Sequence, residues 1–261
     1  MTIKRQWGYV GPDTKLGEIY GHKDSYMAAQ PLGFLTITGS WLPKPPGHIS
    51  NSGSFDFPVR YYCIEGGNQK TIHSGDMSIL DVLIEAAKQA EADGCRAICG
   101  DCGYFGNFQA PIAEAVNIPA YLSSVVQVPW VRAGLRGDQK VGLICADRPN
   151  LTVNTFLSCG MTEADYDSCV IYGGNEYPIF DGLRFSPGRY DCEELKQEIL
   201  NIAKKMMYSH PEVGAIIIEC TDIPPFSHAV MEDLNIPVYD AITFLQFVHD
   251  AVCQMPYYGF L

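Results

Sequence analysis

The sequence contains an internal repeat, which constrains the fold more than any other feature of the chain. Ala97–Ile98 recurs 118 positions later as Ala215–Ile216, and no gap is needed over roughly forty residues. The repeat also carries an acid-cysteine pair, a tyrosine and an Asn-Ile-Pro triplet. These matches are Asp101–Cys102 with Glu219–Cys220, Tyr121 with Tyr239, and Asn117–Pro119 with Asn235–Pro237. We interpret the repeat as two similar halves that arose by duplication.

Short apolar runs alternate with helical patterns along both halves, as in parallel α/β proteins. LGFLTI from Leu32 and VGLICA from Val141 are typical of the first strand in each half. Apolar spacing predicts helices over about residues 79–92 and 192–208. The predicted strands are Gly33–Thr38, Val59–Ile64, Ala97–Gly100, Ala120–Ser123, Val141–Ala146, Ala215–Glu219 and Val238–Ala241.

Duplicated α/β halves usually pack about a pseudo-twofold axis, with ligands at the carboxyl ends of the parallel strands. The expected fold is therefore α/β, with two pseudo-symmetric parallel-sheet domains of Rossmann or flavodoxin type and the active site in the cleft between them. We place the first domain at residues 1–136 plus 236–261 and the second at residues 137–235. Cys102 and Cys220 each follow a strand end, so both thiols are expected to reach this cleft from opposite sides.

The chain contains ten cysteines, and each needs a structural or a chemical role. The start of the chain lacks the apolar core of a signal peptide, so we expect a cytoplasmic protein whose thiols stay reduced. Only Cys102 and Cys220 match each other in the repeat. We interpret the other eight as packing residues, namely Cys63, Cys95, Cys99, Cys145, Cys159, Cys169, Cys192 and Cys253.

Two opposed thiols suit the movement of a proton on and off one carbon atom. One cysteine takes the hydrogen as a thiolate, and the other returns a proton from the opposite face. A free cysteine titrates near ~8.5, so the thiolate needs help from a helix N-terminus or a nearby cation. Asp101 and Glu219 would raise the pKa of an adjacent thiol, so structural roles are expected for them. The candidate substrate-binding residues are Thr221, Ser123, Ser124 and Asn107.

This arrangement requires no cofactor, and no cofactor motif is evident. Cys95, Cys99 and Cys102 have the spacing of an iron–sulfur motif. Residues 96–98 are predicted as a strand, however, where the three sulfur atoms would not converge. The histidines show no close-spaced zinc pattern. We therefore expect neither a cofactor nor a metal.

The net charge of -12 argues against nucleic acid or an anionic membrane as a partner. No apolar stretch approaches the ~20 residues of a membrane span. The expected partner is a small carboxylate substrate, and the formation of a homo-oligomer is left open, with residues 1–31 as a candidate contact with a partner subunit. The Pro-, Gly- and Ser-rich segment Pro43–Phe57 is long enough to cover the cleft.

The segments around the two cysteines resemble the cysteine motifs of the aspartate/glutamate racemase superfamily, which includes hydantoin racemase and arylmalonate decarboxylase relatives. These segments are ICGDCGYFGNFQ around Cys102 and IIIECTDIPPFSHAV around Cys220, and the resemblance extends from Leu32 to IPVYDAIT near the C-terminus. The resemblance implies two pseudo-symmetric α/β domains, a cleft between them and a cofactor-free proton transfer by the two cysteines.

The sequence departs from glutamate racemases proper, whose second cysteine is followed by Thr-His, because this chain has Thr221–Asp222. Its motif sequences are most similar to those of algal dimethylsulfoniopropionate lyases and their bacterial relatives. The similar segments are AICGDCGYF, KKMMYSHPEVGAIIIECTDIPPF and VYDAIT. In those lyases a cysteine removes the α-proton and dimethyl sulfide leaves. We predict an amino-acid racemase, with a dimethylsulfoniopropionate lyase that uses the same cysteines as the alternative. A metabolite-binding protein without turnover is a third hypothesis, against which the intact cysteines argue.

Overall fold

The structure is a computed structural model that describes residues 10–261 apart from residues 16, 19–20, 22–26 and 186–187. The prediction that the start of the chain is not a signal peptide concerns residues outside the described ones. The same holds for much of the segment 1–31, which was predicted as a candidate contact with a partner subunit. The described chain forms two halves, each built on a four-stranded parallel sheet. Among the described residues, no helix combines the length and the apolar character needed to cross a membrane.

The first sheet has the strand order β2-β1-β3-β4, and all of its pairings are parallel. Strand β1 lies at its centre and is buried along most of its length. Buried strands of this kind need apolar side chains on both faces, which explains the continuous apolar runs in the sequence. The strands are β1 Leu32–Thr36, β2 Val59–Cys63, β3 Ala97–Gly100 and β4 Ala120–Tyr121.

The second sheet repeats this topology in the order β6-β5-β7-β8. The register repeats as well, since Leu32 pairs with Ala97 in the first sheet and Val141 pairs with Ala215 in the second. The strands are β5 Lys140–Cys145, β6 Cys169–Gly173, β7 Val213–Ile218 and β8 Val238–Tyr239. The predicted α/β fold with two pseudo-symmetric parallel-sheet domains is confirmed. The strand at residues 169–173 was not predicted.

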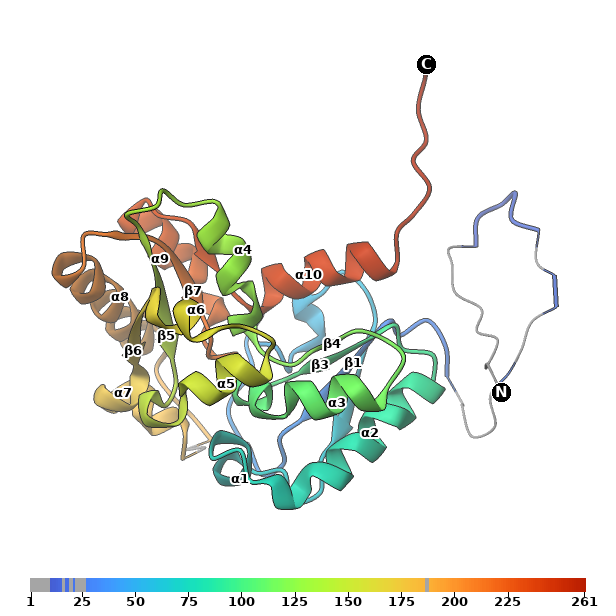
Figure 1. Cartoon of the computed structure of the whole chain (residues 1–261), viewed down its shortest axis with the longest axis horizontal. Helices are drawn as coiled ribbons and strands as arrows, with labels where there is room; N and C mark the ends of the chain where they lie inside the picture. The colour runs from blue at the N-terminus through green and yellow to red at the C-terminus, as the bar shows by residue number, and fades with distance from the viewer. Residues whose placement is uncertain (1–9, 16, 19–20, 22–26, 186–187) are drawn as a thin grey trace.

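Helices cover both faces of the sheets (Figure 1). On the first sheet, α2 packs against one face, and α10 covers the other face together with Phe55 and Phe57. Gly33 and Gly142 occupy equivalent places in β1 and β5, where a β-carbon would press on α2 and on α8 respectively. The helices are α1 Gln69–His73, α2 Leu80–Ala92, α3 Gln109–Ala115, α4 Val128–Ala133, α5 Val153–Ser158, α6 Glu163–Asp167, α7 Pro178–Leu183, α8 Cys192–Ser209, α9 Ser227–Leu234 and α10 Ala241–Val252.

The two halves exchange their last helices. Strand β8 pairs with β7 in the second sheet, whereas α10 packs on Leu32 and Phe34 of the first sheet. The chain therefore returns to the first half after Tyr239 and not at residue 236. In the same way α4, which the sequence places in the first domain, contacts β5 of the second sheet.

Candidate active site

A cleft of about 540 Å³ lies between the two halves, at the carboxyl ends of the central strands. Residues that follow β1 and β3 line it from the first half, and residues that follow β5 and β7 line it from the second half. Tyr104 crosses the boundary between the halves, because its hydroxyl bonds the backbone N–H and C=O of Asp147 at 2.7 Å. The cleft thus lies where parallel α/β sheets usually bind ligands.

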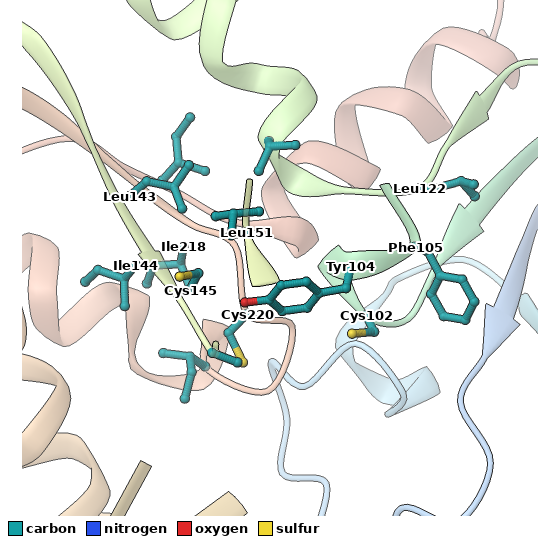
Figure 2. Packing of buried hydrophobic residues seen from close by; sticks show 14 of the residues in the cluster. Cys102, Tyr104, Phe105, Leu122, Leu143, Ile144, Cys145, Leu151, Ile218 and Cys220 are labelled. Atoms are coloured by element: carbon teal, nitrogen blue, oxygen red, sulfur yellow. The ribbon is translucent and has the colours of Figure 1, made fainter. Parts of the chain in front are cut away.

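Cys102 and Cys220 both line this cleft, one from each half. Cys102 follows β3 and Cys220 follows β7, and less than a tenth of either residue is exposed. Figure 2 shows the two thiols on loops from opposite halves, with the ring of Tyr104 extending towards the second half. The structure therefore brings together the two cysteines that the repeat singles out.

The surroundings of both thiols oppose their ionisation. Burial, and then the charge of Glu219, raises the pKa of Cys102 well above its usual value. Burial, and then the charge of Asp222, does the same to the pKa of Cys220. Both environments favour the thiol form, so formation of a thiolate requires a change in local charge.

Two buried acids lie directly before the cysteines. Asp101 accepts hydrogen bonds from the Ile37 N–H at 3.0 Å and from the Ser50 hydroxyl at 3.2 Å. Burial raises the pKa of Asp101 to about 7. Glu219 is fully buried, and neither of its carboxyl oxygens makes a hydrogen bond of normal geometry within the described residues, although the backbone N–H of Ala146 lies close enough to lower its pKa. Burial raises the pKa of Glu219 to about 8, so this carboxyl is protonated at neutral pH.

His48 and Asp222 form a second polar pair in the cleft, which the sequence did not identify. His48 Nε2 lies 3.0 Å from Asp222 Oδ1, and the Ile49 N–H donates to the Thr221 carbonyl at 3.3 Å. The segment Pro43–Phe57 thus folds against the turn that carries Cys220. The length and composition of this segment indicated that it could cover the cleft. They did not indicate that His48 meets Asp222, because His48 lies 172 residues from Cys220 in the sequence.

Of the predicted binding residues, only Thr221 lines the cleft. Its hydroxyl donates to the Asp101 carbonyl at 2.5 Å, so it ties the two cysteine turns together. Asn107 instead bonds the Ile72 and His73 carbonyls and the Thr155 hydroxyl. We therefore do not carry Asn107 into the proposed substrate site.

Ser123 and Ser124 also lie outside the main cleft. The Ser123 hydroxyl accepts the Val125 N–H at 3.3 Å and begins a short 3-10 helix. Both serines line a much smaller cavity of about 10 Å³. A cavity of that volume holds no more than a water molecule, so these residues are left out of the proposed site as well.

Three cationic side chains line the cleft and were not singled out from the sequence. Arg184 Nη1 lies 2.6 Å from Asp147 Oδ2, and Arg184 also pairs with Asp181. Lys44 donates to the Leu42 carbonyl at 3.2 Å, and Lys70 lines the same cleft. The lysines are the candidate partners for a substrate carboxylate. The described residues contain no cluster of three or more metal-ligating side chains.

The packing role predicted for the remaining cysteines is partly wrong. Cys95, Cys99 and Cys145 are buried, as expected of packing residues. Cys63 and Cys192 are exposed, because the first ends an edge strand and the second begins α8.

The fold is shared with the structures of racemases and of a decarboxylase. An aspartate racemase homologue from Pyrococcus horikoshii aligns with 85% of this chain and 99% of its own, with a TM-score of 0.56 and 16% identity. Unliganded arylmalonate decarboxylase aligns with 87% of this chain and 94% of its own, with a TM-score of 0.53 and 12% identity. This likeness shows the fold alone. No protein-family model matches the sequence.

The sequence itself is similar to dimethylsulfoniopropionate lyases. Dimethylsulfoniopropionate lyase 7 of Emiliania huxleyi is 29% identical over 83% of this chain and 66% of its own length. The lyase of Durusdinium sp. clade D is 29% identical over 91% of this chain and 80% of its own. The chain spans only 58% of a further Emiliania huxleyi lyase, lyase 6. The predicted likeness to dimethylsulfoniopropionate lyases is thus found in the sequence, and the predicted likeness to racemases and arylmalonate decarboxylase is found in the fold.

Proposed function

We propose that the cleft is the active site of an enzyme in which a cysteine removes the α-proton of a small carboxylate without a cofactor. The observation that carries this proposal is the placement of Cys102 and Cys220, from matching positions of the two halves, in one cleft. Proton transfer by a positioned side chain is a common source of rate enhancement.

The reaction that we propose is a β-elimination of the kind named for the lyase relatives. In dimethylsulfoniopropionate, the α-proton would move to a cysteine thiolate, and the C–H electron pair would form the carbon–carbon double bond. The carbon–sulfur bond would break with its electron pair going to sulfur, so neutral dimethyl sulfide and acrylate would leave. The cationic leaving group also favours the thiolate, because its positive charge offsets the acids that hold both thiols protonated.

Amino-acid racemisation is the second candidate. The presence of two thiols, one from each half, favours it, since inversion needs an acid and a base on opposite faces of the α-carbon. A β-elimination needs only one base.

The test is turnover of dimethylsulfoniopropionate, aspartate and glutamate in deuterated water. We expect dimethyl sulfide in the headspace and acrylate in solution from the first substrate. Cys102→Ser or Cys220→Ser, or both, should lower the rate about a hundredfold or more. Cys192→Ser, at an exposed thiol outside the cleft, should leave the rate unchanged.

Incorporation of deuterium at the α-carbon with loss of optical activity, and no volatile sulfide, would favour racemisation. Full turnover in both single cysteine variants would exclude thiol catalysis altogether.

A further inference from the structure

Glu219 is a buried carboxyl group that lines the cleft and has no side-chain partner within the described residues. The residue has no exposed surface, yet it lines the cleft. Within the described residues its two oxygens make no ion pair and no hydrogen bond of normal geometry, although the backbone N–H of Ala146 lies close enough to lower its pKa. Leaving such a group unpaired is costly, and native structures rarely do so without a functional reason. Room for it is made by Gly103, since a β-carbon there would collide with the Glu219 carboxyl.

Asp222 lies in the same turn and faces the cleft directly. A quarter of its side chain is exposed (26%), in contrast to Glu219. It is held by His48, whose Nδ1 accepts the Ser50 N–H at 3.0 Å. His48 Nε2 lies 3.0 Å from Asp222 Oδ1, without the geometry of a hydrogen bond. This arrangement fixes one carboxylate at the cleft surface.

The cations of the cleft do not neutralise this pair of acids. Arg184 is paired with Asp147 and Asp181, and Lys44 donates to a backbone carbonyl. Within the described residues no ion pair with Glu219 occurs, and the side-chain contact of Asp222 is with the His48 ring. An excess of acidic groups thus remains at one wall, and the chemistry that would satisfy it is a positive charge on the ligand.

We propose that Glu219 and Asp222 form a subsite for the cationic centre of the substrate, an onium group on a small zwitterion. The inference rests on the proposed function for the identity of the ligand, and it defines the substrate class as one with both a cation and a carboxylate. A sulfonium and an ammonium group share this chemistry. Lys44 and Lys70 remain for the carboxylate end.

The subsite predicts that binding of a cation releases a proton. Burial raises the pKa of Glu219 to about 8, so the carboxyl is protonated near neutral pH and ionises when a cation arrives. The backbone N–H of Ala146 offsets part of this rise, and the titratable side chains found to interact with Glu219 are acids, thiols and one phenol. They are Cys102, Tyr104, Cys145, Asp147, Cys159, Cys220 and Asp222.

The experiment measures binding by titration calorimetry in a Cys102→Ser/Cys220→Ser background, which prevents turnover. The probes are dimethylsulfoniopropionate, β-alanine with its ammonium group, and isocaproate, the neutral carbon isostere of the sulfonium compound. We expect the sulfonium compound to bind at least about tenfold more tightly than isocaproate. Titrations in buffers of different ionisation enthalpy should show proton release near neutral pH.

Glu219→Gln and Asp222→Asn, added singly to that background, test the two acids. Each should bring the affinity ratio close to one, and Glu219→Gln should abolish the proton release. Glu232→Gln, at an exposed residue of α9, is the matched control and should change neither. Asp222→Asn keeps the test valid if Glu219→Gln fails to fold, because Asp222 is partly exposed.

Equal affinity for the sulfonium compound and isocaproate, or an unchanged ratio in both acid variants, would overturn the subsite. β-Alanine distinguishes a sulfonium site from a general onium site. The test of the subsite can fail while the proposed lyase activity holds, and the reverse is also possible. Tight cation binding by a wild-type protein that releases no dimethyl sulfide would refute the lyase activity alone. Release of dimethyl sulfide without a preference for the cation would refute only the subsite.

Discussion

At the scale of single residues, nearby acids oppose the ionisation of both cysteines of the cleft. Glu219 adds to the burial that raises the pKa of Cys102, and Asp222 adds to the burial that raises the pKa of Cys220. A reactive cysteine in other proteins usually lies in an electropositive, partly exposed place. The thiols of this cleft should therefore be unreactive until a cationic ligand changes the local charge.

This leads to a prediction about alkylation. With iodoacetamide near neutral pH, Cys63 and Cys192 should be modified first, because they are exposed to the reagent. Cys102 and Cys220 should react more slowly by about tenfold or more, as expected for buried thiols with raised pKa values. Peptide mass spectrometry over a time course measures each rate. Faster labelling of either cleft cysteine would show that it is a thiolate in the free protein.

At the scale of elements, the turns after β3 and β7 are packed against each other. Thr221 donates to the Asp101 carbonyl, and the Glu219 side chain occupies the place that a side chain at residue 103 would need. The turn after β3 therefore accepts only glycine at this point. The backbone of Gly103 is not in the left-handed region, so the requirement is one of space.

Gly103→Ala should therefore destabilise the protein by about 1–3 kcal/mol, as expected for overpacking at a rigid contact. Activity should fall as well, since the Glu219 carboxyl must move. Urea unfolding measures the first effect, and turnover of the substrate measures the second. Gly137→Ala is the control, because a β-carbon there meets no atom within 4 Å. Equal stability of both variants would show that the turn can move apart at little cost.

At the scale of the whole molecule, the contact between the halves buries acids that prefer to be neutral. Burial raises the pKa of Glu219 from 4.5 to about 8 and that of Asp101 from 3.8 to about 7. Between these values the folded protein keeps protons that the unfolded chain releases. The stability contributed by each acid is therefore fully present below its unfolded pKa and is lost as pH rises through its folded pKa.

The melting temperature of the unliganded protein should accordingly fall as pH rises from about 5 to about 9. In Glu219→Gln the fall should be smaller by several degrees, because the carboxyl that must ionise is gone. Circular dichroism melts across this pH range measure the difference, with Glu232→Gln as the exposed control. A Glu219→Gln variant with the same pH slope as the wild type would mean that Glu219 ionises freely in the folded state.

The sequence alone determined the two-fold architecture and the cysteine pair. Strand spacing, apolar runs and the repeated acid-cysteine motif are local patterns, and parallel topology then places both strand ends at one cleft. The strand Cys169–Gly173 was missed because its five residues, only two of them buried, form an edge strand without a long apolar run.

Only the tertiary structure decided which polar groups share the cleft with the thiols. His48 meets Asp222, and Glu219 meets Gly103, across more than a hundred residues of chain. Ser123, Ser124 and Asn107 lie near Cys102 in the sequence, but their hydrogen bonds direct them elsewhere. The contact of α4 with the second sheet was equally invisible in the sequence. Local patterns specify elements and strand ends, whereas the contacts that set charge at the site are made between segments that the sequence does not bring together.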